Sequence, residues 1–339
     1  MLIYEILAPL YLKILGNNSF EHFTRLGINV LEEEIIEEIK QYVISRQNLD
    51  GGFSDKAGNS DMYYSLFGYW LCRGLDLKTP LKSLREFVLK NEVNKAGAEV
   101  DWICMVVLFK VLIVDRKGQK LSLKQKIFSD KQHHTYRYQK ESRNQQNLFK
   151  KKHNEFRNKH KAYRKALRKL VFENPQASEN YFPFLGLMAF YYLKDYSSVL
   201  KLIAAEQPAT FDTRKNLPTP VLAANLILAS LAVGKKIGQN RTQESITQIK
   251  QALIGRYHES GGFRATLSSP LPDLLSTSVA LYALNFANVN VNLYKPSCFE
   301  FVNMLYEQGG FVATALDKEP DMEYTFYGLL ALGALASAK

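Results

Sequence analysis

The chain has 339 residues, of which 46% are hydrophobic, and its formal net charge is +11. The charge is uneven, because residues 115–170 hold 19 Lys or Arg and 4 Asp or Glu, a net of +15, which leaves −4 for the remainder. No run reaches the roughly 18 apolar residues that span a bilayer, and three scattered cysteines argue against a disulfide framework.

The chain begins with a segment, residues 1–15, that we interpret as an amphipathic helix and not as a signal peptide. It carries Glu5, lacks a basic start and has no small-residue cleavage site. Residues 17–19 are predicted to form a turn, and residues 31–47 the next helix. We therefore expect a cytoplasmic protein, with peripheral membrane contact left open.

Three stretches share one pattern. An apolar-periodic helix ends at a Gly-Gly-Phe triplet, and an Asp about ten residues later begins a second, more apolar helix. The triplets begin at Gly51, Gly261 and Gly309. The last two lie 48 residues apart, and the first lies 210 residues before the second, a little over four such periods. A period of this length indicates a repeat architecture. Glycine supplies the left-handed conformation that ends a helix, and Asp is a good N-cap. We expect the Phe to pack back onto the helix just ended.

The other elements follow the same alternation of outer amphipathic and inner buried helices. In chain order, helices are predicted over residues 61–75, 81–91, 99–113, 148–170, 181–193, 197–205 and 218–233. Strand signals are few. We therefore predict an all-α chain of about eleven to thirteen helices, built as a single domain over residues 1–339 with a basic helical insertion at 116–172.

The first repeat carries a family resemblance. Gln47-x-x-Asp50-Gly51-Gly52-Phe53 with Asp61-x-x-Tyr64-Ser65 resembles the repeats of protein prenyltransferase β-subunits and squalene/oxidosqualene cyclases. The resemblance covers about residues 30–115 and 215–337. It implies an α/α toroid of five to six helix pairs around an apolar cavity that holds an isoprenoid chain. It also implies a partner protein, since prenyltransferase β-subunits work with an α-subunit.

The metal and diphosphate motifs of that family are changed here. Leu275 stands where the D-x-C pattern has its Cys, and Tyr324 where the D-x-x-H pattern has its His. A single carboxylate does not hold zinc, so we expect neither a metal nor a cofactor. The cyclases' D-x-D-D acid motif is absent too. Arg264 keeps one cation of the diphosphate site, where it either binds a phosphate or is a solvated loop residue.

The candidate catalytic residues are carboxylates at the starts of inner helices. They are Asp321, Glu323, Asp273, Asp101 and Glu99. A carboxyl buried at the rim of the cavity has a raised pKa and can act as a general acid. The alternative is that each Asp, including Asp61, is only a helix N-cap. The aromatic candidates for lining the cavity are Tyr64, Trp70, Trp102, Tyr324 and Tyr327, which alternatively fill the core.

The segment Leu148 to Leu170 is predicted to be a basic amphipathic helix with a heptad-spaced stripe of Phe149, Phe156, Tyr163 and Leu170. Three fates fit this helix: docking on the toroid, contact with an anionic membrane or with a partner protein, and, less favoured, contact with nucleic acid. Four of the six histidines, His133, His134, His153 and His160, lie in the basic segment, where we expect a solvated cationic face and not a metal site.

Two functions remain open. The first is a zinc-independent protein that binds an isoprenoid or other long apolar ligand, and that acts on a terpenoid or prenyl substrate. The alternative is a catalytically degenerate toroid that serves binding or assembly, with the basic helix as its contact surface. No P-loop, dinucleotide-binding glycine pattern or G-x-S-x-G elbow occurs.

Overall fold

The computed structural model describes residue 16 and residues 19–91, 99–115, 136–173, 182–205, 216–232 and 239–337; in the long basic helix, side chains are described from Asn154 onward. These ranges contain thirteen α-helices and two short β-hairpins, which confirms the predicted all-α class. Within these ranges no helix is both long and apolar enough to cross a bilayer. The helix predicted over residues 1–15 lies outside the described residues.

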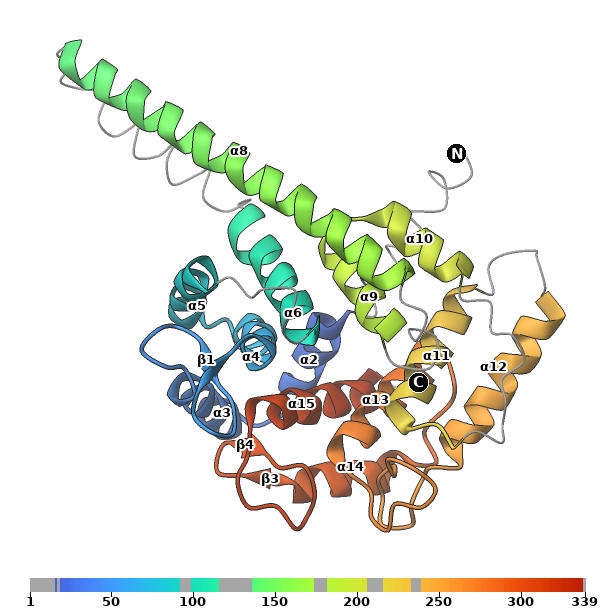
Figure 1. Ribbon diagram of the computed structural model, residues 1–339. Coiled ribbons are helices and arrows are strands. Elements are labelled where there is room, and N and C mark those ends of the chain that lie inside the picture. The colour runs from blue at the N-terminus through green and yellow to red at the C-terminus, as the bar shows by residue number, and fades with distance from the viewer. Residues whose placement is uncertain are drawn as a thin grey trace.

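Inner helices of the described chain stand side by side, each in contact with its neighbours in the ring. They are α4 (Met62–Gly74), α6 (Glu99–Phe109), α9 (Phe182–Tyr192), α11 (Thr219–Ala232), α13 (Leu274–Phe286) and α15 (Met322–Ser337). Helix α15 contacts α4, so the ring closes (Figure 1). These helices are apolar on more than one face because a ring position buries them on every side.

The outer helices cover the outside of this ring (Figure 1). They are α3 (Glu33–Ser45), α5 (Lys78–Lys90), α8 (Tyr136–Phe172), α10 (Tyr196–Ala205), α12 (Gln239–Ile254) and α14 (Lys295–Met304). Their sequences are amphipathic: α3 buries Ile39 and Val43, while its glutamates face solvent. Because outer and inner helices alternate along the chain, the fold is an α/α toroid, as the repeats predicted.

The Gly-Gly-Phe triplet makes the turn from an outer to an inner helix. Its first glycine has a φ of 94° at Gly51, 102° at Gly261 and 83° at Gly309, values that a side chain would strain. The Phe that follows is fully buried, and in the first repeat a Cβ on Gly68 of α4 would overlap the ring of Phe53. In the first and last repeats the Phe therefore packs against the inner helix that follows, and its packing onto the preceding helix stays a prediction.

A hydroxyl four residues after each capping Asp holds this turn against the inner helix. Ser65, Thr277 and Thr325 accept the backbone N–H of the Phe at 3.0, 2.9 and 3.2 Å. The same segments form the β-hairpins of the first and last repeats. Their strands are β1 (Phe53–Ser54), β2 (Ser60–Asp61), β3 (Tyr306–Glu307) and β4 (Gly310–Phe311). The repeats are thus alike in their hydrogen bonds as well as in their sequence.

Helix α2 (Phe20–Ile28) was not predicted. Its N-cap is Ser19, whose hydroxyl accepts the backbone N–H of His22 at 3.3 Å. Helix α2 packs against α15 and α4 and lies within the ring of inner helices in Figure 1. It does not belong to the alternating pairs of outer and inner helices, and it fills the centre of the ring.

The contact between α2 and α15 is unusually close because glycines stand at the crossing. A Cβ on Gly27 would overlap the carbonyl oxygen of Leu329, and a Cβ on Gly333 would overlap that of Phe23. The two backbones therefore touch where any other residue would hold them apart. This crossing fixes the position of α2 inside the ring.

The long helix α8 begins before the predicted segment and is attached to the toroid by its C-terminal half. Tyr163, Leu167 and Leu170 are buried, and Phe156 is partly buried against the core. The stripe predicted from the sequence therefore docks on the ring, as far as its side chains are described. His160, expected on the solvated face, is instead buried at 9% exposure, because it lies on the same docked side.

A buried ion pair secures this docking. Asp195, at the start of α10, is fully buried and accepts hydrogen bonds from the Arg168 Nε at 2.7 Å and Nη2 at 2.6 Å. Arg164 Nη2 lies 2.9 Å from the same carboxylate. Burial alone raises the pKa of Asp195, but the two guanidinium groups outweigh it and hold that pKa well below its usual range. Part of the basic charge of α8 is thus neutralised internally.

Candidate functional site

Three aspartates of the repeats act as helix N-caps at the rim of the ring. The Oδ1 of Asp61, Asp273 and Asp321 accepts the backbone N–H of the third residue of each inner helix, in each case at 2.8 Å. This satisfies one of the unpaired N–H groups of the first turn. Burial raises the pKa of the Asp273 carboxyl, against the opposing hydrogen bonds from the helix. The capping role, which the sequence left as the alternative, is what these contacts provide.

Asp321 has a second contact that joins the last repeat to the first. It is 2% exposed, and its Oδ2 lies 3.2 Å from the Nζ of Lys56. The same ammonium lies 5.2 Å from the centre of the Tyr324 ring. Because the Lys56 side chain is 65% exposed, this ion pair is only weakly stabilising. It nevertheless places a cation over the rim where α15 meets the first hairpin.

Glu323 is a half-buried carboxyl at the rim. Its Oε1 accepts a hydrogen bond from the Tyr63 hydroxyl at 2.7 Å, between α15 and α4. Burial raises the pKa of Glu323, and the nearby Asp321 raises it further, against the opposing hydrogen bond from Tyr63. Burial raises the pKa of Tyr63 as well, so its hydroxyl stays a neutral donor. A carboxyl in this setting can hold and release a proton near the ring.

Tyr63 was not among the predicted site residues, although its neighbour Tyr64 was. The family motif singles out the position of Tyr64, which lies near the rim carboxylates; burial and the charges of Asp321 and Glu323 raise its pKa. The Tyr63 ring lies edge-on to Phe67 at 4.9 Å. Only the position of Glu323 on the neighbouring helix makes Tyr63 part of the site, and that position is not visible in the sequence.

The carboxylates of α6 complete this side of the rim. Asp101 lies in the first turn of the helix, and its pKa is raised by burial and by the negative charge of Asp61. Glu99 is exposed at the start of the same helix. Asp101 thus lies beside Asp61, whereas Glu323 lies beside Asp321. The structure therefore brings the predicted carboxylates into small groups at neighbouring helix starts.

Arg264 lies in the loop that leads to α13. Its backbone oxygen accepts a hydrogen bond from the Thr219 hydroxyl at 2.6 Å, and its Nη1 lies 3.4 Å from the carbonyl oxygen of Leu267. Arg256, which was not predicted, lies close by; its Nη2 donates to the carbonyl oxygen of Leu217 at 2.9 Å. Burial lowers the pKa of Arg256, and the charge of Arg264 lowers it further. Both arginines hold loop carbonyls in place.

The predicted lining aromatics lie in different surroundings. Trp102 is 4% exposed and faces Tyr163 of the docked helix α8, with ring centres 6.2 Å apart. Tyr324 and Tyr327 lie together at the start of α15, with ring centres 6.5 Å apart. Trp70 is 3% exposed and points to the centre of the ring. Tyr64 is at the rim, so only Trp70 reaches the innermost position.

The centre of the ring is occupied by Phe20 of α2. Its ring lies 5.2 Å from that of Trp70 on α4, 6.2 Å from Phe184 on α9, 5.3 Å from Tyr282 on α13 and 5.5 Å from Phe326 on α15. One side chain therefore contacts four inner helices that are far apart in the sequence. Such edge-on and tilted aromatic contacts are favourable beyond the area that they bury.

A chain of hydrogen bonds holds the start of α2 in this position. The indole Nε1 of Trp70 donates to the Tyr192 hydroxyl at 2.8 Å. That hydroxyl donates to Oε1 of Glu21, also at 2.8 Å. Burial raises the pKa of Tyr192, and the adjacent carboxylate of Glu21 raises it further. Helices α4, α9 and α2 are thus tied together at the ring centre by polar groups that satisfy one another.

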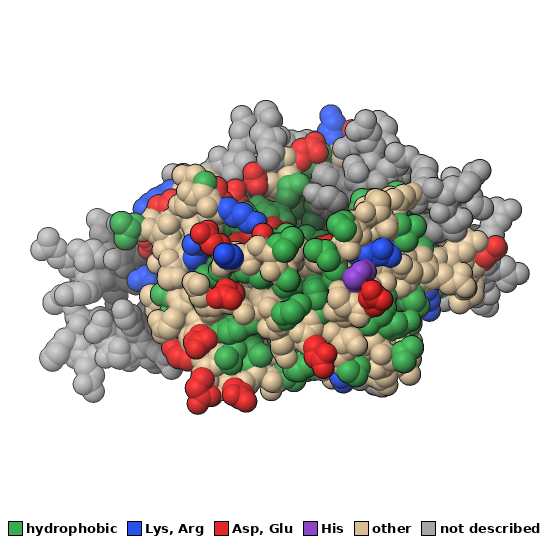
Figure 2. Space-filling model, turned by 90° about the horizontal axis from the view of Figure 1, so that it is seen from below, with side chains coloured by type: hydrophobic (Ala, Val, Ile, Leu, Met, Phe, Trp, Pro, Cys, Tyr) green, Lys and Arg blue, Asp and Glu red, His purple; other side chains and the backbone are tan. Residues whose placement is uncertain are grey.

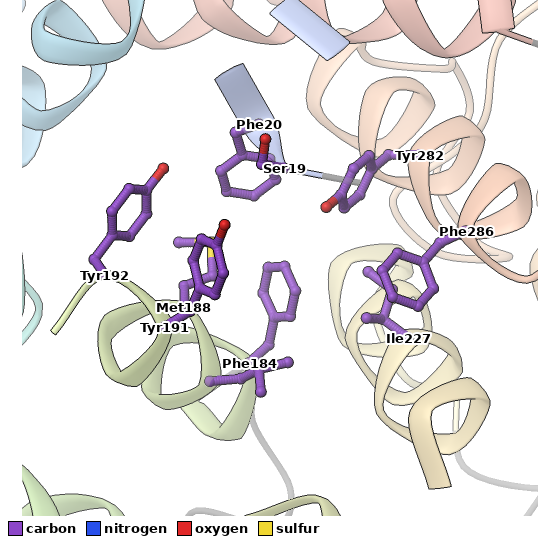
Figure 3. Close-up of a pocket in the computed structure, with 10 residues that line it drawn as sticks. Ser19, Phe20, Phe184, Met188, Tyr191, Tyr192, Ile227, Tyr282 and Phe286 are labelled. Atoms are coloured by element: carbon purple, nitrogen blue, oxygen red, sulfur yellow. The ribbon is translucent and has the colours of Figure 1, made fainter. Parts of the chain in front are cut away.

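What remains open beside Phe20 is small. A cavity of about 30 Å³ lies between the start of α2 and helices α9, α11 and α13, and Figure 3 shows aromatic side chains converging on it. Its lining is Ser19, Phe20, Phe184, Leu187, Met188, Tyr191, Tyr192, Ile227, Tyr282 and Phe286. This volume is roughly that of one water molecule. None of the five predicted lining aromatics borders this cavity.

The positions that hold zinc in the prenyltransferases have other surroundings here. Leu275 follows the capping Asp273, and Tyr324 donates its backbone N–H to Asp321. Across the part of the chain that the structure describes, no group of three or more His, Cys, Asp or Glu side chains is placed to hold a metal ion. The rim is therefore a set of carboxylates and tyrosines that bind helix ends, Lys56 and one another.

Comparison with known proteins agrees with this architecture. The family model of the prenyltransferase alpha-alpha toroid domain matches residues 10–97 and 198–338, well over half of the chain. The unmatched middle includes α6, the long helix α8 and α9. No curated protein and no solved structure matches the chain. On the repeats, the closed ring and the match, the chain belongs to the prenyltransferase alpha-alpha toroid domain family.

Proposed function

We propose that this toroid is a binding and assembly protein whose ring centre is occupied by its own helix α2 in place of an isoprenoid. The observation that carries the proposal is the position of Phe20, in contact with aromatic residues of four inner helices. A prenyl chain at the centre would have to displace this side chain. The glycine crossing at Gly27 and Gly333 opposes that displacement, because α2 is packed backbone to backbone against α15.

The hydrogen bonds of the ring support the same function. Glu21 on α2 accepts from Tyr192, which in turn accepts from Trp70. Withdrawal of α2 would leave the Tyr192 hydroxyl without its acceptor Glu21, at a cost of about 1–3 kcal/mol. Helix α2 thus makes both apolar contacts, through Phe20, and a polar contact, through Glu21, with the inner helices of the ring. A closed ring of this kind is a rigid frame that presents its outer helices and rim loops.

A second function is favoured by one feature, the Tyr63–Glu323 pair. Glu323 has a raised pKa and lies beside the ring, so it is the best-placed general acid for a terpenoid or prenyl substrate. This enzymatic function requires that α2 leave the ring centre, or that the substrate bind at the rim. The choice between the two functions therefore depends on what the ring centre can bind.

The test is ligand binding by the purified chain. Farnesyl and geranylgeranyl analogues are titrated while the Tm is measured, because a ligand that binds the folded state raises it. The wild type is expected to show no shift, whereas Phe20→Ala, which opens space at the centre, is expected to bind small apolar probes. Phe299→Ala on the exposed face of α14 is the matched control. A dose-dependent rise in the Tm of the wild type would contradict the proposal.

A further inference from the structure

The outward face of α8 carries a row of basic side chains. Arg157, Lys161, Lys165 and Lys169 recur every four residues, and all four are exposed. Residues four apart on a helix lie on one side, about 6 Å apart along the axis. Lys169 has only a long contact of 4.0 Å with Glu173. The row therefore presents cations along about 18 Å of helix.

This row is distinct from the arginines that dock the helix. Arg164 and Arg168 bind the buried Asp195, so their charges are compensated within the fold. A basic helix that served only to dock would need no further cations on its outer side. Apart from those two arginines, residues 154–173 hold five Lys or Arg and two acids, Glu155 and Glu173, so the charge around the row is not fully compensated.

The apolar residues of α8 are turned away from this face. Tyr163, Leu167 and Leu170 are buried against the toroid, and Phe156 is partly buried. A helix that lies in a membrane interface inserts its apolar face among the acyl chains, but in the described half of α8 that face is already used. The aromatic rings that could stack on unpaired bases are covered for the same reason. What the face offers is charge.

The helix is also displayed prominently. Figure 1 shows α8 extending well beyond the ring at its N-terminal end, and residues 136–153 of the sequence add six Lys or Arg against one Glu. Figure 2 shows the side of the molecule next to α14, where acidic side chains outnumber basic ones. The charge of the protein is thus separated between the two sides, which orients a polyanion toward α8.

We propose that the outward face of α8 binds the phosphate backbone of nucleic acid, with duplex preferred over single strand and without base recognition. A duplex carries one negative charge per about 1.7 Å of its axis, so a row of cations that turns slowly around the helix meets several phosphates at once. The described face has no aromatic side chain to stack on a base, and contacts to phosphates carry no sequence information, so the binding is expected to be independent of sequence. This proposal rests on the proposed function in one respect: it takes the outer helix α8 as the surface through which the binding protein contacts its partner.

The experiment measures binding of the full chain to a fluorescent 20-base-pair duplex by anisotropy between 50 and 200 mM salt. Four phosphate contacts predict a log–log salt slope of about −3.6. In Lys161→Gln/Lys165→Gln, loss of two contacts is expected to lower the affinity about 30-fold at 150 mM salt and to reduce the slope by about 1.8. Both substitutions are exposed, so the unfolding transition should be unchanged.

The matched control is Lys82→Gln/Lys318→Gln, which removes the same charge from exposed sites outside α8. It should change the affinity less than about twofold, since it removes no phosphate contact. Equal losses in the two double variants would overturn the proposal, as would the absence of duplex binding by the wild type at 50 mM salt. Binding to phosphatidylserine vesicles without binding to duplex would also overturn it. A prenyl analogue that binds the ring with duplex binding intact would contradict the proposed function alone.

Discussion

The indole Nε1 of Trp70 and the hydroxyl of Tyr192 form a hydrogen bond of 2.8 Å across the ring, between α4 and α9. The same hydroxyl donates to Glu21, so the pair also holds α2. Trp70 was predicted to line a ligand cavity, and it does face the centre of the ring. The indole N–H of Trp70 has its hydrogen-bond partner within the protein, because it donates to the Tyr192 hydroxyl of α9.

The first prediction concerns that hydroxyl. Tyr192→Phe keeps the ring but leaves the indole N–H of Trp70 and the carboxylate of Glu21 without a partner. We expect a loss of about 2 kcal/mol in the free energy of unfolding, measured by urea denaturation. Tyr191→Phe is the control, since no hydrogen bond of that hydroxyl supports α2, and it should cost less than about 0.5 kcal/mol. Equal effects would show that Tyr192 contributes only its ring.

The second prediction tests the glycine crossing of α2 and α15. In Gly27→Ala the new methyl group would overlap the carbonyl oxygen of Leu329, so the helices must separate. We expect a loss of more than about 3 kcal/mol. At Gly255 a Cβ would meet its nearest atoms at 3.4 and 3.5 Å, which is ordinary contact. Gly255→Ala should therefore be tolerated, and a similar loss for both variants would contradict the assigned position of α2.

The third prediction uses the raised pKa of Glu323. A carboxyl whose pKa is higher in the folded state makes the fold less stable as it ionises, so the penalty is absent below the unfolded pKa and complete above the folded one. Glu323→Gln keeps an oxygen for Tyr63 but cannot ionise. Its stability relative to the wild type should therefore rise between pH 4 and pH 8.

Glu307→Gln, at an exposed position, serves as the control for Glu323→Gln and should show no such trend. Thermal unfolding across the pH series gives the comparison directly. If Glu323→Gln were equally destabilising at every pH, the hydrogen bond from Tyr63 would outweigh the cost of burying the charge, and the raised pKa would be refuted.

The fourth prediction concerns His160 under the docked half of α8. Burial, followed by the charges of Lys110 and Arg164, lowers its pKa to about 4, against the opposing charges of Asp115 and Asp195. Since the unfolded chain binds a proton near pH 6.5 and the folded chain does not, stability should fall as the pH drops from about 6.5 to about 4. The loss is on the order of 2–3 kcal/mol.

His160→Gln removes this titration, so its stability should depend less on pH in that window than that of the wild type. His258, which is partly exposed in the turn before Gly261, provides the matched His258→Gln control. Parallel pH profiles for wild type and His160→Gln would contradict the buried position of the imidazole.

The repeats made the ring predictable. Gly51, Gly261 and Gly309 require a left-handed backbone where an outer helix gives way to an inner one, and that local requirement marks the alternation of outer and inner helices. Helix α2 was missed because it is short and has no counterpart in the repeats. The sequence marks its start only by the N-cap Ser19. The contacts of Phe20 could not be predicted, because ring closure brings its partners together from four helices that are far apart in the sequence.

The site was harder to predict for the same reason. The capping aspartates could be inferred locally, because a cap is a contact within one turn. Tyr63 and Tyr192 could not, since their partners Glu323 and Trp70 come from other helices, 260 and 122 residues away in the chain. Periodicity shows which face of a helix is apolar. It does not show which aromatic faces the ring centre and which, like Trp102, faces a docked outer helix.

Amide hydrogen exchange of α2 in the full chain shows directly whether this helix stays in the ring centre. If α2 is an integral plug, its hydrogen-bonded amides from Phe23 to Ile28 should exchange as slowly as those of α15, and only through global unfolding. Their rates should then depend on denaturant with the full unfolding slope. Fast exchange of α2 that does not depend on denaturant, with α15 still protected, would show that the ring centre opens readily and would contradict the account.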